Sequence, residues 1–266
     1  MKVAAIQMVS RAQTAENLAI AERLLREAKS DGAELIVLPE YWPIMGLRDR
    51  DKVDCAESFG CGPLQSFLQQ MAAELGVILV GGTIPLVSNV DGKIFNACLV
   101  YGPDGQLITR YDKIHLFGFQ NGEEAYQESN TITPGEDIGA FDLPIGKVGL
   151  GICYDLRFPE LFRSMGKCSL IILPAAFTHV TGQAHWEVLL RARAIENQCY
   201  VLASAQGGLH ENGRRTWGHS MLIDPWGKVL SCLEEGEGLC LGNLDVDTMQ
   251  KIRTNLPALQ HRKIAC

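Results

Sequence analysis

Three side chains of complementary chemistry, a carboxylate, an ammonium and a thiol, each stand at or just past the end of an apolar, β-like run. Glu40 closes AELIVLPE, Lys113 follows ITRYD, and Cys153 ends KVGLGIC. A lysine between hydrophobic neighbours lowers stability unless an acid pairs with it. Meeting in one cleft, the three would form a nucleophilic site in which Glu40 takes the thiol proton and Lys113 supplies positive charge.

Taken alone, Cys153 is an ambiguous signal. The segment YDLRFPEL after it predicts a turn into a helix, with Pro159 in the first helical turn. A residue at the C-terminal edge of a strand faces the crevice where open α/β sheets bind ligands, and nearby N–H groups lower a thiol pKa. The same position also suits a small buried hydrophobe, which is our interpretation of most of the other cysteines. None of the six histidines lies in a motif that identifies it as the partner base.

Composition narrows the class of protein. The 266 residues are 47% hydrophobic and 21% charged, which is enough for a substantial core. The net charge is −7 and no basic run exceeds two residues, so we expect neither a nucleic-acid partner nor a membrane partner. The nine cysteines are an odd number, and no two of them have the two-residue spacing of zinc or redox motifs, which favours a reducing compartment. The N-terminus lacks a signal-peptide pattern. We therefore expect a cytoplasmic protein that acts on a small molecule.

The elements that position these residues follow an α/β pattern, because short apolar, β-branched runs alternate with longer amphipathic segments. The predicted strands cover 3–7, 35–38, 77–81, 97–101, 148–153, 170–173, 200–205, 220–223 and 238–244. The predicted helices cover 15–30, 63–75, 159–165, 185–197 and 247–255.

Two similar segments indicate a loose internal duplication. YGPDGQLI (101–108) and IDPWGKVL (223–230) each predict a hairpin with a turn built on Pro and Gly. No linker or shift in composition divides the chain, so we expect a single domain over 1–266. The segment 117–135 is the longest stretch without periodicity, and long loops of this kind are often functional.

Five strings distributed along the whole chain carry a resemblance: LIVLPE, YDKIHLF, GLGICYDLRFPEL, AHWEVLLRARAIENQCYV and WGHSMLIDPWGKV. In order and in kind they resemble the nitrilase, or carbon-nitrogen hydrolase, superfamily. The resemblance implies an α/β, four-layer αββα sandwich and a homodimer joined through outer helices. It assigns Glu40 as general base, Lys113 as oxyanion stabiliser and Cys153 as nucleophile. It also places a second glutamate at Glu128, within AYQESN.

The implied mechanism is hydrolysis of an amide to an acid and ammonia through a thioester on Cys153. Lys113 and the backbone N–H of Tyr154 would stabilise the oxyanion, and Glu128 would position the lysine, the substrate or both. Because protein groups supply the nucleophile, the base and the electrophile, the resemblance implies no metal and no organic cofactor.

The downstream strings resemble the Nit branch of the family, which includes deaminated-glutathione amidase and omega-amidase. Arg157 fits a clamp for a substrate carboxylate, with a salt bridge to Asp155 or Glu160 as the structural alternative. The branch also points to Phe177 and Thr181 as pocket residues. The pattern RARAIENQCYV favours deaminated glutathione as substrate, with omega-amidase activity and a non-catalytic scaffold protein as the alternatives.

Overall fold

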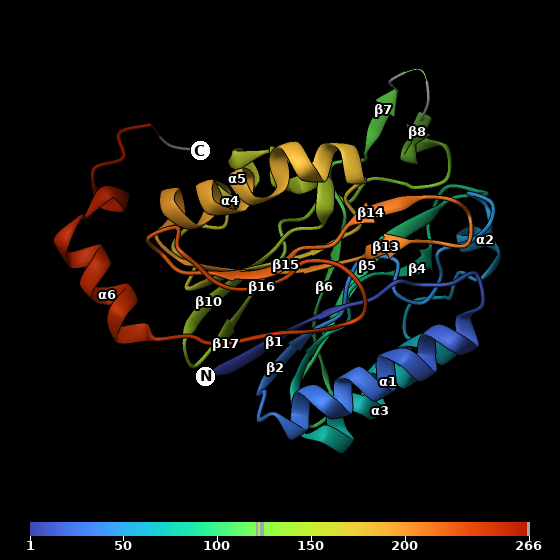
Figure 1. The fold of residues 1–266 in the computed structure, drawn as a ribbon, viewed down its shortest axis with the longest axis horizontal. Coiled ribbons are helices and arrows are strands. Elements are labelled where there is room, and N and C mark those ends of the chain that lie inside the picture. The colour runs from blue at the N-terminus through green and yellow to red at the C-terminus, as the bar shows by residue number, and fades with distance from the viewer. Residues whose placement is uncertain (121, 123–124, 265–266) are drawn as a thin grey trace.

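A computed structural model describes residues 1–120, 122 and 125–264. Cys266 therefore lies outside the described residues, as do positions 121, 123 and 124 of the segment 117–135. Two sheets form the centre of the molecule, and helices cover their outer faces (Figure 1). Within the described residues, no helix has the length and apolar character needed to cross a membrane.

The first sheet takes six of its seven strands from the N-terminal half of the chain. It contains β1 (Lys2–Gln7), β2 (Leu35–Val37), β3 (Ile78–Val80), β4 (Ile84–Val87), β5 (Ile94–Tyr101), β6 (Leu107–Asp112) and, from the C-terminal end, β17 (Gly238–Asn243). The order is β17-β1-β2-β3-β5-β4, with β6 beside β5. α1 (Thr14–Ser30) follows β1 and α3 (Pro63–Leu75) precedes β3.

The second sheet has six strands in the order β16-β15-β12-β11-β10-β9. They are β9 (Ala140–Leu143), β10 (Gly146–Leu150), β11 (Leu170–Ala175), β12 (Tyr200–Ala205), β15 (Ser220–Ile223) and β16 (Val229–Leu233). α4 (Pro159–Ser164) and α5 (His179–Asn197) connect its three parallel strands β10, β11 and β12.

Shorter elements lie at the ends of the sheets. They are α2 (Asp51–Asp54), the hairpins β7 (Gly118–Gln120) with β8 (Ala125–Gln127) and β13 (Gly207–Leu209) with β14 (Arg215–Trp217), α6 (Val246–Asn255), and the 3-10 turns η1 (Glu128–Asn130), η2 (Cys153–Arg157) and η3 (Ala258–Gln260). The β7–β8 hairpin projects from the same end of the sandwich as β13, β14 and α2, whereas α6 lies at the other end (Figure 1).

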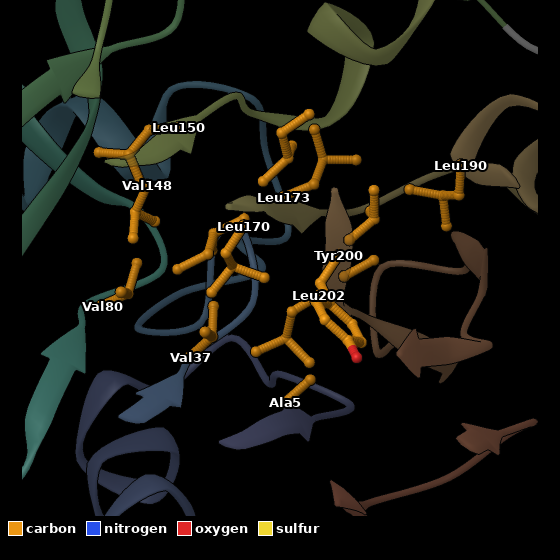
Figure 2. Close-up of a cluster of buried hydrophobic side chains, with 14 of the residues drawn as sticks. Ala5, Val37, Val80, Val148, Leu150, Leu170, Leu173, Leu190, Tyr200 and Leu202 are labelled. Carbon is orange, nitrogen blue, oxygen red and sulfur yellow. The ribbon is translucent and has the colours of Figure 1, made fainter. Parts of the chain in front are cut away.

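Alternation of side chains along the strands builds the layers. Val3 and Ala5 of β1 belong to the core between the sheets, whereas Ala4 and Ile6 belong to the core beneath α1 and α3. Figure 2 shows Ala5 and its neighbours on the first sheet facing side chains of the second sheet, such as Leu202. The same core continues to the inner side of α5, where Leu190 is fully buried. The layers are therefore helix, sheet, sheet, helix, which is the predicted αββα sandwich.

Both sheets share one plan. In each, three parallel strands joined by helices are followed by an antiparallel strand that starts a hairpin: β5 with β6 in the first sheet and β15 with β16 in the second. The two predicted hairpins are therefore confirmed, and they occupy equivalent places in the two halves. This is the arrangement that a duplicated unit would produce.

Several predicted boundaries were shifted, such as the strand predicted from residue 97, which begins at Ile94, and two of these shifts have identifiable reasons. The strand predicted over 148–153 ends at Leu150, because the Ile152 N–H donates to the Asp155 carboxylate at 2.8 Å and turns the chain out of the sheet. The helix predicted from residue 185 begins at His179, because the Thr178 side chain caps it by accepting from the Thr181 N–H. The aperiodic segment 117–135 contains the β7–β8 hairpin rather than irregular chain alone.

Candidate active site

The structure brings the predicted lysine and both predicted glutamates into direct contact. Lys113 Nζ lies 2.8 Å from Glu40 Oε1 and 2.9 Å from each carboxylate oxygen of Glu128. Lys113 and Glu40 are almost completely buried, and Glu128 is 13% exposed. Each of the two carboxylates thus offsets the cost of burying the ammonium.

Glu40 lies in a turn after β2 and is held through both carboxylate oxygens. The Asn96 side chain donates to Oε1 at 2.9 Å, and the Ala176 backbone N–H donates to Oε2 at 2.8 Å. The Gln206 side chain donates to the backbone carbonyl of Glu40 at 3.0 Å. The turn continues through Tyr41, whose φ of 55° is left-handed and uncommon for a bulky residue. The carboxylate therefore has a fixed direction, which a general base requires.

Glu128 and Lys113 are positioned by different parts of the chain. Glu128 begins η1, after the β7–β8 hairpin, and accepts from the Tyr41 hydroxyl at 2.8 Å and the Phe117 N–H at 2.6 Å. Lys113 follows β6 directly, and its N–H donates to the Asn96 carbonyl at 3.1 Å. Tyr41 directly follows Glu40 in the chain, so its hydrogen bond connects the Glu40 turn to Glu128, which is distant in sequence.

Cys153 begins the turn η2. Its φ of 50° is a left-handed backbone conformation that residues other than glycine seldom adopt. The fully buried Asp155 holds this turn by accepting from the Ile152 N–H and from the Tyr111 hydroxyl at 2.7 Å. Backbone strain of this kind persists only where the surrounding structure enforces it, and it is frequent at functional sites. The Cys153 side chain is close enough to Glu40 to affect the ionisation of that carboxyl.

Burial and the neighbouring charges set the ionisation of the cluster. Burial raises the pKa of Glu40, Lys113 opposes this rise, and the negative charge of Glu128 adds to it. Burial also raises the pKa of the Cys153 thiol well above its usual value, and the Glu40 charge raises it further. For Lys113, burial lowers the pKa, but both glutamates outweigh it and hold the pKa well above its usual value. The resting site therefore contains a neutral thiol and a charged lysine.

A small pocket surrounds the sulfur and contains all four predicted substrate-binding residues. It is lined by Cys153, Phe117, Tyr154, Arg157, Ala176, Phe177, Thr178 and Thr181. The Arg157 guanidinium lies over the rings of Tyr154 and Phe177, at 5.7 and 5.5 Å from their centroids.

The structural alternative for Arg157 was a salt bridge with Asp155 or Glu160. Among the described residues Arg157 forms no ion pair, and its Nη1 lies 3.2 Å from Nδ1 of His185. Asp155 instead binds Tyr111, His115 and the backbone N–H of Ile152. The guanidinium therefore keeps donors for a ligand in the pocket.

A much larger cavity of about 730 Å³ adjoins the cluster on the side of the β7–β8 hairpin. Tyr41, Phe117 and Glu128 belong to its wall, together with Arg48, Lys52 and Arg214. Sequence reasoning did not identify this cavity, because its wall comes from four separate segments. In the described ranges, no group of three or more His, Cys, Asp or Glu side chains is placed to hold a metal ion.

Three residues that position the site were not among the predictions. Asn96 orients Glu40, Tyr41 orients Glu128, and Asp155 holds the Cys153 turn. Asp155 lies two residues after Cys153, but the sequence suggested it only as a salt-bridge partner of Arg157. Asn96 lies within a buried strand, where a polar residue needs a partner, and that requirement was the available signal.

Comparisons with known proteins give one consistent result. The family model "Carbon-nitrogen hydrolase" matches residues 2–254. The chain is 41% identical to a deaminated glutathione amidase of Synechocystis sp. strain PCC 6803, over 97% of both chains. It is 38% identical to the omega-amidase NIT2 of Mus musculus, over 98% of this chain and 95% of that one. The NitFhit protein of C. elegans shares its fold with a TM-score of 0.90 at 36% identity, over 98% of this chain and 65% of that longer one.

Proposed function

Because this chain belongs to the carbon-nitrogen hydrolase family, we propose that Cys153 is the nucleophile with which it cleaves the amide bond of a small substrate bearing carboxylates. The protein is a hydrolase of carbon-nitrogen bonds in linear amides. The assignment of roles is supported above all by the Glu40–Lys113–Glu128 contacts, with distances of 2.8 and 2.9 Å. Acyl transfer needs a nucleophile, a base and a positive charge. The Cys153 thiol, a buried carboxylate and the buried ammonium can supply these three functions.

In the first step the Cys153 sulfur attacks the amide carbonyl carbon while Glu40 accepts the thiol proton. The raised thiol pKa means that the proton must leave as the bond forms, which is why a base in contact is needed. The Lys113 ammonium, held by Glu40 and Glu128, stabilises the oxyanion together with the Tyr154 N–H.

Collapse of the tetrahedral intermediate breaks the carbon-nitrogen bond. Glu40 gives its proton to the leaving nitrogen, and the acyl group stays on the sulfur as a thioester. Glu40 then takes a proton from water, the hydroxide attacks the thioester, and the carboxylic acid leaves as the thiol recovers its proton. Glu128 holds Lys113 throughout and need not exchange a proton.

We propose deaminated glutathione as the substrate, supported by relatives of that name from Synechocystis and from Yersinia enterocolitica at 41% and 39% identity. Arg157 would bind the carboxylate of the 2-oxo acid portion in the pocket beside the sulfur. With this substrate the leaving group is the amine of cysteinylglycine. The expected release of ammonia therefore applies only to a primary amide, such as the substrates of the omega-amidase alternative.

The omega-amidase alternative is supported by the 38% identity to the mouse enzyme. Steady-state rates on deaminated glutathione and on 2-oxoglutaramate separate the two. We expect the first substrate to be preferred, and a preference of about tenfold for the second, equivalent to 1.4 kcal/mol, would reverse the assignment. A non-catalytic scaffold has no use for the buried Glu40–Lys113–Glu128 cluster, whose assembly is costly.

The Cys153→Ala variant tests the nucleophile. Hydrolysis of both substrates should fall to the uncatalysed rate, while circular dichroism remains that of the folded protein. Cys61→Ala is the matched control, because Cys61 is an exposed free thiol outside the pocket. Full product formation by Cys153→Ala would overturn the mechanism.

We further propose a homodimer formed through α5. Three apolar side chains on this outer helix are exposed: Val180 by 51%, Val188 by 69% and Ile195 by 50%. Trp226, 63% exposed, lies in the turn whose Gly227 packs beside Ile195. Exposed apolar groups on one face favour a protein partner, and a second copy of this chain would cover them.

Two further proposals remain from the sequence. We propose that residues 1–266 form one domain, which is supported by the pairing of β17, from the C-terminal end, with β1. We also propose a cytoplasmic location, which is supported by the free thiols of the described cysteines.

A further inference from the structure

We propose that the 730 Å³ cavity beside the β7–β8 hairpin binds the amine portion of the substrate and that Arg214 recognises a carboxylate there. The inference rests on the proposed function and specifies its substrate class: amides whose nitrogen carries a substituent with a carboxylate. The cavity, which is far larger than the pocket around the sulfur, would then hold the part of the substrate that leaves with the nitrogen.

The cavity and the pocket meet at the catalytic residues. Cys153 and Arg157 line the pocket, Glu128 and Tyr41 line the cavity, and Phe117 lines both. A substrate with its carbonyl carbon at the sulfur can therefore place its acyl portion beside Arg157. The group on the nitrogen then extends past Phe117 into the cavity.

Arg214 differs from the other two cations of the cavity wall. Arg48 pairs with Asp51 at 2.8 Å, and Lys52 pairs with Asp49. Arg214 forms no ion pair with any residue that the structure describes.

Within the described part of the chain, the side-chain contacts of Arg214 are weak. Its guanidinium lies 4.7 Å from the centroid of the Tyr126 ring, and its Nη1 lies 3.9 Å from Met45 Sδ, a poor acceptor. Tyr126 and Met45 also line the cavity. A half-buried guanidinium held by a ring and a thioether keeps donors for a carboxylate, which it can bind through two parallel hydrogen bonds.

The size of the cavity discriminates between leaving groups. Ammonia needs no space beyond the reacting atoms, whereas sites for whole small molecules occupy about 300–1,000 Å³. An amine the size of a dipeptide with a terminal carboxylate matches both the volume and the charge. As the carbon-nitrogen bond breaks, this amine takes the proton from Glu40 and leaves into the cavity, while the acyl group stays on Cys153.

Three substrates and two variants test the inference. The substrates are deaminated glutathione, its C-terminal carboxamide analogue, which lacks the distal charge, and 2-oxoglutaramate, which lacks the whole substituent. For the unmodified enzyme we expect kcat/KM on deaminated glutathione to exceed that on the carboxamide by about tenfold or more, as for the loss of one hydrogen-bonded charge pair.

In Arg214→Gln this preference should disappear through a rise in KM for deaminated glutathione. The rates on the carboxamide and on 2-oxoglutaramate should change less than about threefold, a loss well below that of a charged hydrogen bond. Arg215→Gln is the matched control, because Arg215 is exposed, pairs with Glu235 at 3.2 Å and does not line the cavity. It should keep the preference.

The outcomes separate the two proposals. An enzyme that cleaves the carboxamide as well as the free acid, or an Arg214→Gln variant that loses all three activities equally while folded, overturns the role of Arg214. Cleavage of 2-oxoglutaramate without cleavage of deaminated glutathione overturns the use of the cavity and leaves the amidase mechanism intact. Failure to cleave any of the three overturns the proposed substrate class and this inference with it.

Discussion

The Asp155 carboxylate accepts two hydrogen bonds from His115, one from the backbone N–H at 3.0 Å and one from the ring Nδ1–H at 2.7 Å. Asp155 follows Cys153 by two residues, and His115 follows Lys113 by two residues. The contact therefore joins the two segments that carry the thiol and the ammonium, although the segments come from different sheets. It fixes their separation independently of any substrate.

Asp155→Asn should destabilise the protein. All the groups facing this carboxylate are donors, so an amide nitrogen would leave one or two of them unsatisfied in a fully buried place. We expect the free energy of unfolding in urea to fall by about 3 kcal/mol. Tyr111→Phe removes a single donor and should cost about 1 kcal/mol. Equal stability of Asp155→Asn and the unmodified protein would contradict the role of this carboxylate.

Asn96→Ala should lower kcat with little change in KM. Its amide donates to Glu40 Oε1 at 2.9 Å and does not line the substrate pocket, so its loss affects the direction of the base rather than binding. One hydrogen bond to a charged group corresponds to a decrease in kcat of about 10- to 100-fold. Steady-state kinetics on deaminated glutathione measure both constants. A rise in KM alone would assign Asn96 to substrate binding instead.

The pH dependence of kcat/KM should report the ionisation of Glu40. Burial raises the pKa of this carboxyl above 4.5, and the base must be ionised to accept the thiol proton, so activity should fall as pH decreases through that raised value. The Glu128 charge contributes to the rise. Glu128→Gln should therefore move the acid limb to lower pH, besides lowering kcat through the weaker hold on Lys113.

The control for this shift is Glu22→Gln, on the exposed face of α1, where Glu22 pairs with Arg26. It should leave the pH profile unchanged. An acid limb that moves to higher pH in Glu128→Gln would show that a different group is being titrated.

Val188→Asp should dissociate the proposed homodimer. Val188 is 69% exposed on α5, and a carboxylate there would face its own copy across a two-fold interface. Sedimentation velocity should show a dimer for the unmodified protein and a monomer for the variant. Val90→Asp, at an exposed valine outside the helix, should remain dimeric. A monomeric unmodified protein would refute the proposed assembly.

The local sequence pattern was enough to propose Glu40, Lys113 and Cys153 as catalytic residues, but not to identify the residues that hold them in place. Glu40, Lys113 and Cys153 each follow a strand, and strand ends can be located from apolar runs. The partner of Glu40, Asn96, is 56 residues away, and the pairing of β17 with β1 connects opposite ends of the chain. Such contacts depend on how the sheets pack, which hydrophobic periodicity does not encode.

The missed start of α5 has a local cause. Thr178 caps the helix, but the segment after it contains Gly182, which weakens a helical pattern. In the structure a Cβ at Gly182 would lie 2.3 Å from Trp217, so glycine is required there by packing. The contact with Trp217 thus explains why a glycine, which has a low helix propensity, lies within this helix.

The left-handed turn at Cys153 has an evolutionary consequence. Glycine adopts a φ of 50° at little cost, whereas cysteine does not. Directed evolution screened only for heat tolerance would therefore tend to replace Cys153 with glycine, which would stabilise the turn and remove the proposed nucleophile. Retention of cysteine at this position would therefore depend on selection for turnover, because stability alone favours glycine.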